Sequence, residues 1–206
     1  MSELDRFLKA QEKDYETALQ QIKNGKKASC WMWYIFPQIV GLGMTSTAKY
    51  YGIKDIEEAI EYLNNETLGA RLVEISQALL ELDDDTNINE VMGYPDNLKL
   101  KSSMTLFKKA SEKSGNKYDD VFQKVLEKYY YGQDDQKTLD ILSSQAKDKI
   151  KENNENEKIE NVKINENKDE NEKDETKKDI KELEPNESEV KEVNKGCCES
   201  LSCEIF

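Results

Sequence analysis

The sequence predicts an all-α, multihelical fold, and three observations support that prediction. Apolar residues recur at intervals of three and four along most of the first 145 residues, which is the spacing of one helix face. No segment shows a convincing alternation of apolar and polar residues, the pattern of a half-buried strand. Glycine, proline and short polar clusters divide the helical pattern into segments of ordinary helix length. We therefore expect one domain of packed helices.

The first helix is expected to be about twenty residues long, with Ser2 as its cap and Gly25 near its end. Its apolar residues fall on one stripe, formed by Leu4, Phe7, Leu8, Tyr15, Ala18, Leu19 and Ile22. The next stretch, "ASCWMWYIFPQIVGLG", is apolar on every side. It is either a short helix that is buried all round or a buried extended segment, and both alternatives place it in the core. Pro37 ends or kinks a helix there, and Gly41 and Gly43 indicate a turn.

Six further helical segments follow this apolar stretch. They are "TSTAKYYGI", "KDIEEAIEYLNN", "ETLGARLVEISQALLEL", "YPDNLKLKSSMTLFKKA", "YDDVFQKVLEKYYYG" and "DDQKTLDILSS", with the polar turn "DDDTN" and the short "INEVMG" between the third and the fourth. The first is closed by Gly52, and the second begins near Asp55. Asp96 or Asn97 is the expected cap of the "YPDN" helix, because short polar side chains satisfy the free N–H groups of a first turn.

Composition divides the chain into three parts. Residues 1–145 are expected to form the helical domain, residues 146–196 a disordered Lys/Glu/Asn-rich spacer, and residues 197–206 a cysteine-rich end. Between Lys151 and Gly196 there are ten lysines, sixteen Asp or Glu residues and no aromatic residue. Such a tract cannot bury enough apolar surface to offset the entropy lost on ordering, so we expect a flexible spacer.

The residue types present exclude several functions. Histidine is absent, which removes Ser-His-Asp and Cys-His catalysis and imidazole metal sites. Cys30 is the sole cysteine of the expected domain, so we expect neither a metal site nor a resident cofactor. The formal charge of -13 and the lack of a basic stripe argue against nucleic acid as a partner.

Four blocks carry a resemblance to a known family. They are "CWMWYIFPQIVGLG", "YLNNETLGARL", "PDNLKLKSSMTLF" and "VFQKVLEKYYYGQDDQKTLDIL". In this order they resemble the family called domain of unknown function 1810 (DUF1810), over residues of about 4–143. The resemblance implies a multihelical fold with a short central helix surrounded by others, and it implies no reaction. Family members commonly have histidine where this sequence has Cys30, so a catalytic role of that histidine would here be lost or pass to a thiolate.

Seven residues are candidates for binding a ligand. The aromatic rings of Trp31 and Trp33 can stack on a planar group, and the turn at Gly41 and Gly43 can present backbone N–H groups to a phosphate. Three cations, Arg71, Lys99 and Lys101, can hold an anion. Each residue also has a purely structural interpretation: core aromatics, a turn, an interhelical ion pair and solvated lysines. Lys99 could also activate Ser102 or Ser103 as a nucleophile, but only if the lysine were buried.

The last residues, "CCESLSCEIF", predict lipid modification. Cys203, Glu204, Ile205 and Phe206 fit the C-a-a-X prenylation pattern, in which the cysteine is the acceptor. One lipid holds a membrane only marginally, and an acidic spacer is repelled by anionic lipid. Cys197 and Cys198 are therefore expected to be palmitoylated as a second anchor.

Two functions remain open from the sequence alone. The first is a helical ligand- or partner-binding module held at a cytoplasmic membrane face by its lipidated C-terminus. The alternative is an enzyme that acts on a nucleotide-like or phosphorylated small molecule at a pocket near Trp31 and Lys99. A phosphorylated small molecule or a protein is the expected soluble partner of either.

Overall fold

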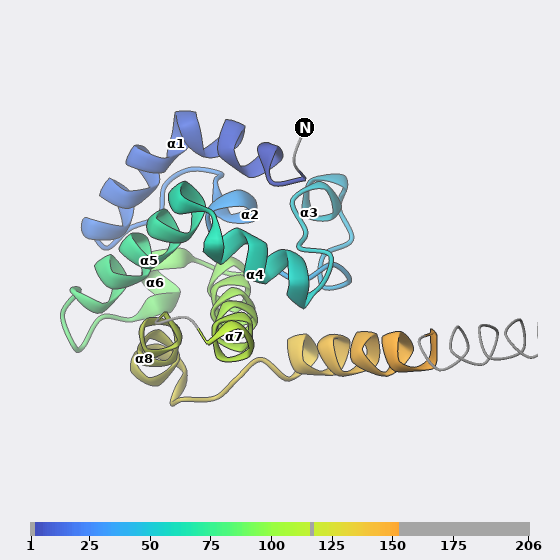
Figure 1. Cartoon of the computed structure of the whole chain (residues 1–206). Helices are drawn as coiled ribbons and strands as arrows, with labels where there is room; N and C mark the ends of the chain where they lie inside the picture. The colour runs from blue at the N-terminus through green and yellow to red at the C-terminus, as the bar shows by residue number, and fades with distance from the viewer. Residues whose placement is uncertain (1–2, 116–117, 153–206) are drawn as a thin grey trace, which may run out of the picture. The chain divides into compact units, whose positions relative to one another are not determined.

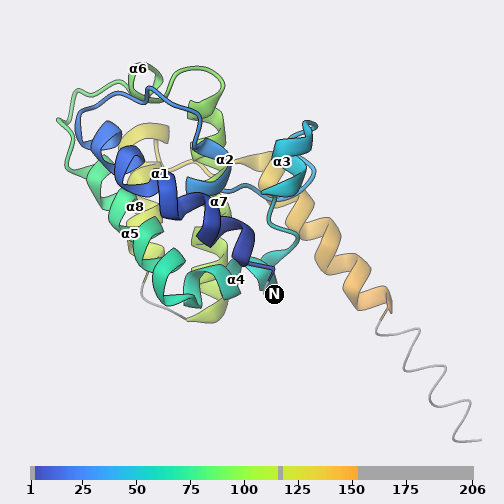
Figure 2. The same cartoon turned by 90° about the horizontal axis from the view of Figure 1, so that it is seen from above.

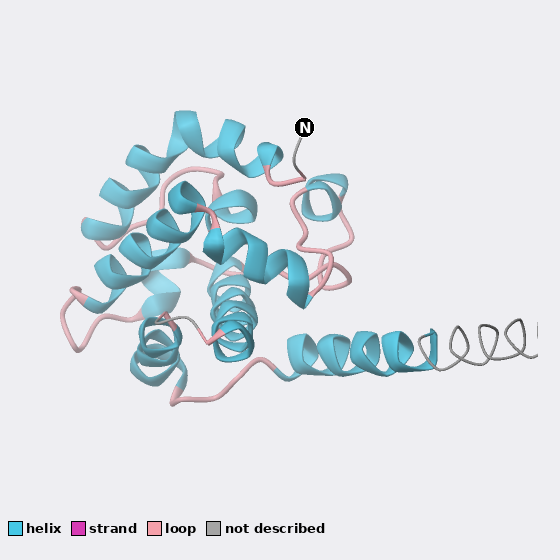
Figure 3. Ribbon diagram, viewed as in Figure 1, coloured by secondary structure: helices cyan, strands magenta, loops and turns pink. Residues whose placement is uncertain are grey.

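A computed structural model describes residues 3–115 and 118–152 of the chain, and these residues form helices and connecting loops (Figures 1 and 3). The helices are α1 (Asp5–Lys23), α2 (Met32–Ile35), α3 (Ser46–Tyr50), α4 (Ile56–Asn64), α5 (Glu66–Leu80), α6 (Ile88–Met92), α7 (Asp96–Ser114) and α8 (Asp119–Tyr130). A further helix begins at residue 136 and is described through residue 152; it is called the 136–152 helix below. The predicted all-α class is confirmed.

Helix α7 is the central element of the fold. Figure 1 looks nearly along its axis and shows the other helices around it. It packs against α8 and α4, while α1 packs against α5 and α2. Every residue from position 102 to 108 is buried, so this helix is covered on almost all sides. Phe107 of α7 is one of the largest buried side chains, and its ring contacts those of Tyr62 and Phe122.

The sequence left open whether the apolar segment after α1 is a short helix or extended, and the structure contains both. Residues Met32–Ile35 form the expected short helix, α2, with Met32 and Ile35 buried and Trp33 and Tyr34 half-buried. Pro37 ends it, and the chain then runs extended. Ile39 forms an isolated parallel bridge with Ile53, with the Val40 N–H donating to the Ile53 carbonyl at 2.8 Å.

Helix capping follows the sequence at α4 but not at α7. The predicted helix start near Asp55 is confirmed, and Asp55 caps α4 by accepting a hydrogen bond from the Glu58 N–H at 3.0 Å. The prediction for α7 is wrong, because Pro95 occupies the cap position and Asp96 is the first helical residue. The Asp96 carboxylate is engaged by lysine side chains instead, which leaves it unavailable to the first turn.

Helices α4 and α5 approach closely where the sequence reads "LGARL". A Cβ atom at Gly69 would lie 2.1 Å from the carbonyl oxygen of Leu63, so only glycine fits there. At the other end of the described chain, the 136–152 helix continues past residue 145, the expected limit of the domain. Contacts group the residues up to Ile150 into one compact unit. Within the described residues, no helix is long and apolar enough to cross a bilayer.

Candidate functional site

A cavity of about 570 Å³ lies where the loop after α2, the start of α3, the start of α7 and the start of the 136–152 helix meet. In Figure 2 the first turns of the 136–152 helix lie close to α3. We call it the Trp33 cavity. Its lining residues are Trp33, Gln38, Leu42, Gly43, Met44, Thr45, Ala48, Pro95, Leu98, Lys99, Ser102, Asp135 and Lys137. The volume lies in the range of small-molecule sites.

The Trp33 ring and the Lys99 ammonium form one wall of this cavity. Trp33 is half-buried on α2, and Lys99 is in the first turn of α7. The Lys99 Nζ atom lies 4.9 Å from the centroid of the Trp33 ring, which is within the range of a cation–π interaction. The ammonium therefore lies over one face of the indole, and both side chains line the cavity.

The charge of Lys99 belongs to a triad. The Asp96 carboxylate bonds Lys99 at 2.7 Å through one oxygen and Lys27 at 2.6 Å through the other. Burial alone would raise the pKa of Asp96, but the hydrogen bonds from Lys27 and Lys99 outweigh burial and hold its pKa below the usual value. One carboxylate thus serves two ammonium groups, and the triad carries a net positive charge.

The polar wall beside this triad is fixed by hydrogen bonds. Gln38 donates from Nε2 to the Ser102 Oγ atom at 2.5 Å, and the Ser102 hydroxyl donates to the Lys99 carbonyl at 3.1 Å. Ser102 is buried, so these bonds determine which way its hydroxyl points. Gln38 is placed by the extended residues after Pro37, which the bridge to Ile53 holds.

The start of the 136–152 helix closes the opposite side. The Asp135 N–H donates to the Thr105 Oγ1 atom of α7 at 2.8 Å, which ties this helix to the central one. One Asp135 oxygen accepts hydrogen bonds from the Thr138 N–H at 2.9 Å and from the Thr138 hydroxyl at 2.7 Å. Asp135 is therefore a helix cap, and the exposed Lys137 adds a positive charge beside it.

The turn at Gly43 brings the loop that lines the cavity close to α3. A Cβ atom at Gly43 would lie 2.5 Å from the Ala48 Cβ atom, so the loop can reach α3 this closely only with glycine. Thr45 caps α3, its Oγ1 atom accepting from the Ala48 N–H at 3.1 Å. These residues hold the loop over the cavity.

The structure brings together three of the seven predicted ligand-binding residues, namely Trp33, Gly43 and Lys99. Trp31 is a core residue that is 1% exposed, and its indole N–H donates to the Gln21 side chain at 2.8 Å.

The other predicted residues lie elsewhere. Gly41 faces Ile141, whose Cδ1 atom would be 3.4 Å from an added Cβ. The Arg71 guanidinium carbon lies 4.9 Å from the Tyr15 ring centroid, and Lys101 Nζ lies 5.9 Å from that of Tyr130. None of these three is among the residues that line the Trp33 cavity.

Lys99 and Ser102 both line the cavity but do not form a nucleophile and base. Lys99 Nζ bonds the Asp96 carboxylate, and Ser102 Oγ accepts from Gln38 and donates to a backbone carbonyl. Cys30 is exposed with a free thiol. The geometry of the cavity suits holding a molecule through an aromatic face and cations.

Sequence reasoning missed Gln38, Asp135 and Lys137. Gln38 follows the proline that ends α2, and its position in a conspicuous apolar block was a usable signal. Asp135 was identifiable as a helix cap from "DDQKTL", but its place beside α7 was not. Cys197, Cys198 and Cys203 lie outside the described residues, as does most of the expected spacer.

The fold and this cavity define a small all-α protein with a solvent-facing pocket at the start of its central helix. The chain belongs to the family described as protein of unknown function DUF1810, whose model matches residues 1–142. It is similar to the crystal structure of the conserved hypothetical protein Rv1873 from Mycobacterium tuberculosis, with 39% identity and a TM-score of 0.64. The match covers 68% of this chain and 96% of that one. No curated protein matches the chain.

Proposed function

We propose that the helical domain is a binding module for a small phosphorylated molecule that carries a planar group. The observation that carries this proposal is the Trp33 ring beside the Lys99 ammonium in one cavity. A planar group can stack on the indole, and a phosphate can bind Lys99. Two parts of one ligand would then contact two adjacent side chains.

The charges around the cavity support an anionic ligand. Lys27, Lys99 and Lys137 face two carboxylates, those of Asp96 and Asp135, and Asp135 already accepts two hydrogen bonds from Thr138. This excess of positive charge stands out in a chain whose formal charge is -13. A cleft with an excess of one sign of charge concentrates ligands of the opposite sign.

Binding is favoured over the enzymatic alternative because the reactive groups of the cavity are already engaged. Ser102 is held by Gln38 and by a backbone carbonyl, and Lys99 is held by Asp96. A nucleophile needs a base within hydrogen-bond reach, and these contacts supply none to Ser102.

Calorimetric titration of the full chain with AMP, adenosine and ribose 5-phosphate tests the proposal. AMP is expected to bind more tightly than either half, because it alone engages both the indole and the ammonium. Trp33→Leu should weaken AMP and adenosine while leaving ribose 5-phosphate nearly unchanged. If AMP and ribose 5-phosphate give no heat, or if Trp33→Leu and Lys99→Met leave binding unchanged, the cavity is not a phosphate-ligand site.

We further propose that this module is tethered to a cytoplasmic membrane face by its C-terminus. The support is the sequence pattern alone: Cys203 in a C-a-a-X end, with Cys197 and Cys198 available for a second acyl chain. The tether would keep the binding domain near a membrane without a spanning helix.

A single substitution tests the tether in a eukaryotic cell. The wild-type chain is expected in the membrane fraction, with an intact mass raised by an isoprenoid, and Cys203→Ser is expected in the soluble fraction. Ser202→Ala is the matched control, because it changes the neighbouring residue and leaves the acceptor. Equal partition of wild type and Cys203→Ser, with no isoprenoid mass, would refute the tether.

A further inference from the structure

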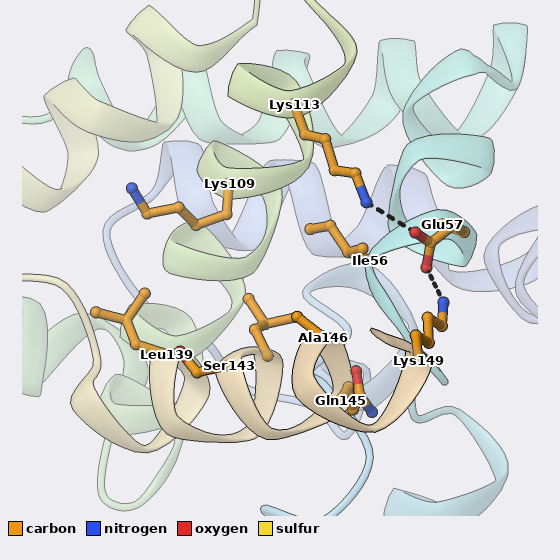
Figure 4. A pocket seen from close by; sticks show the side chains of 10 residues that line it. Ile56, Glu57, Lys109, Lys113, Leu139, Ser143, Gln145, Ala146 and Lys149 are labelled. Carbon is orange, nitrogen blue, oxygen red and sulfur yellow. Dashed lines mark hydrogen bonds and ion pairs between the residues drawn. The ribbon is translucent and has the colours of Figure 1, made fainter. Parts of the chain in front are cut away.

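A second cavity of about 420 Å³ lies between the start of α4, the end of α7 and the 136–152 helix (Figure 4). We call it the Gln145 cavity. Its lining residues are Ile56, Glu57, Lys109, Lys113, Leu139, Leu142, Ser143, Gln145, Ala146 and Lys149. It shares no lining residue with the Trp33 cavity, so it can be tested separately.

The walls of this cavity are apolar. Leu139, Leu142 and Ala146 come from one face of the 136–152 helix, and Ile56 comes from the first turn of α4 opposite them. Leu139, Leu142 and Ile56 are only partly buried, and Leu142 and Ile56 pack against the hydrophobic core. A molecule seated between them would remove their remaining apolar surface from water, which favours binding.

One buried acceptor in the cavity has no partner. The Gln145 Nε2 atom donates to the Lys54 carbonyl at 2.8 Å, and this bond fixes the orientation of the amide. The Gln145 Oε1 atom is left buried without a hydrogen bond. Figure 4 shows this oxygen on the side of the amide that faces Ile56. An unpaired buried carbonyl costs free energy, and a hydrogen-bond donor would recover it.

The lysines at the mouth of the cavity form ion pairs with nearby carboxylates. Glu57 bonds Lys113 at 2.8 Å and also Lys149, as the dashed lines in Figure 4 show. Lys149 lies 3.2 Å from Asp55 as well. Lys109 pairs with Glu112 at 2.7 Å. Three lysines face three carboxylates, so the cavity favours no ligand charge.

From these contacts we propose a second binding site, for a neutral apolar molecule that carries one hydroxyl or amide N–H donor. The apolar body lies between Ile56, Leu139 and Leu142. The donor binds the Gln145 Oε1 atom. The ion pairs of Glu57 stay intact at the mouth, because the ligand has no charge to exchange with them.

Two isomeric probes test the donor requirement. 1-Octanol and 1-methoxyheptane have the same atoms, but only the alcohol donates a hydrogen bond. Each is titrated into the full chain, and the methyl NMR signals of Ile56, Leu139 and Leu142 are followed. The alcohol is expected to bind about three- to tenfold more tightly, the worth of one buried hydrogen bond. Gln145→Met keeps the length of the side chain and should abolish this difference.

A filling variant tests the location. Ala146→Phe places a ring in the cavity and should eliminate the shifts caused by both probes. Ser144→Phe is the matched control, because its exposed position on the same helix is outside the lining. Absence of shifts at the three residues in the wild-type chain would overturn the site. Equal affinity of the two isomers in the wild-type chain would overturn the role of Gln145, with water then the partner of its oxygen.

Discussion

The two cavities both use α7 and the 136–152 helix, but they differ in how their charges are matched. The Trp33 cavity takes Lys99 from the start of α7 and Lys137 from the start of the 136–152 helix. The Gln145 cavity takes Lys113 from the end of α7 and Lys149 from far along the 136–152 helix. Lysines are therefore common to both, and their presence alone does not decide which ligand a cavity suits.

What differs is the number of carboxylates for each ammonium. At the Trp33 cavity the three ammonium groups of Lys27, Lys99 and Lys137 have two carboxylates, Asp96 and Asp135, so an excess of positive charge remains. In the Gln145 cavity each lysine has a carboxylate to match. The first arrangement suits an anion, and the second suits a neutral molecule with an apolar body. Three substitutions, taken from the largest expected effect to the smallest, examine this difference.

Lys99→Met is expected to have the largest effect, on binding. It removes the ammonium beside Trp33 and should weaken AMP about ten- to a hundredfold, because hydrogen bonds to charged groups contribute about 1.5–3 kcal/mol. Lys101→Met is the matched control, since Lys101 lies against Tyr130. It should change the affinity less than about twofold by calorimetry. Equal losses in the two variants would mean that only overall charge matters.

Asp96→Asn is expected to act on stability and on binding in opposite directions. Two partly buried lysines lose their shared carboxylate, so the free energy of unfolding at pH 7 should fall by about 1–2 kcal/mol in urea titrations. Binding of AMP should strengthen, because Lys99 is released from Asp96. A loss of both stability and affinity would indicate that Asp96 positions Lys99 for the ligand.

The pH dependence of that stability difference follows from the lowered pKa of Asp96. A carboxylate with a lowered pKa stabilises the folded state above its unfolded pKa of about 3.9, and this contribution is lost as the pH falls through the lower folded value. The gap between wild type and Asp96→Asn should therefore be full at pH 7 and shrink below about pH 4. A gap that is constant with pH would show that the charge of Asp96 is not its source.

The helices could be predicted from the sequence because their signals are local. Apolar spacing, Pro37 and Asp55 each act within a few residues. The cap of α7 could not be predicted, because Asp96 is drawn away by Lys27, a residue about seventy positions earlier, and that contact depends on the fold.

Of the four paired candidates, Trp33 and Lys99 line the cavity, whereas Trp31 and Lys101 do not. Lys99 and Lys101 are two positions apart on α7, and two positions on a helix turn the side chain through about 200°. Trp31 is the cap residue that precedes α2, and Trp33 lies within that helix. The members of each pair therefore face different surroundings. Trp31 enters the core while Trp33 lines the cavity, and Lys101 meets Tyr130 while Lys99 meets Trp33. All four residues are candidates from the sequence, and only the folded structure shows which member of each pair lines the cavity.

Glu57→Gln is expected to have the smallest effect, because the ion pairs that it removes are about half exposed and screened by solvent. Hydrogen bonds from Lys113 and then Lys149 lower the pKa of Glu57 to about 2. Its stabilisation is thus present above the unfolded pKa of about 4.3 and is lost as the pH falls toward 2. We expect a loss below about 1 kcal/mol at pH 7, reduced further by salt.

The same substitution separates the two cavities. Removing Glu57 leaves Lys113 and Lys149 without their shared carboxylate, so the Gln145 cavity acquires the charge excess that the Trp33 cavity has. An anionic probe of the same chain length, octanoate, should then shift the methyl signals of Ile56 and Leu139 in Glu57→Gln more than in wild type. Glu61→Gln, on the same helix and outside this lining, is the control. If octanoate binds wild type and Glu57→Gln equally, the balance of charge is not what distinguishes the two cavities.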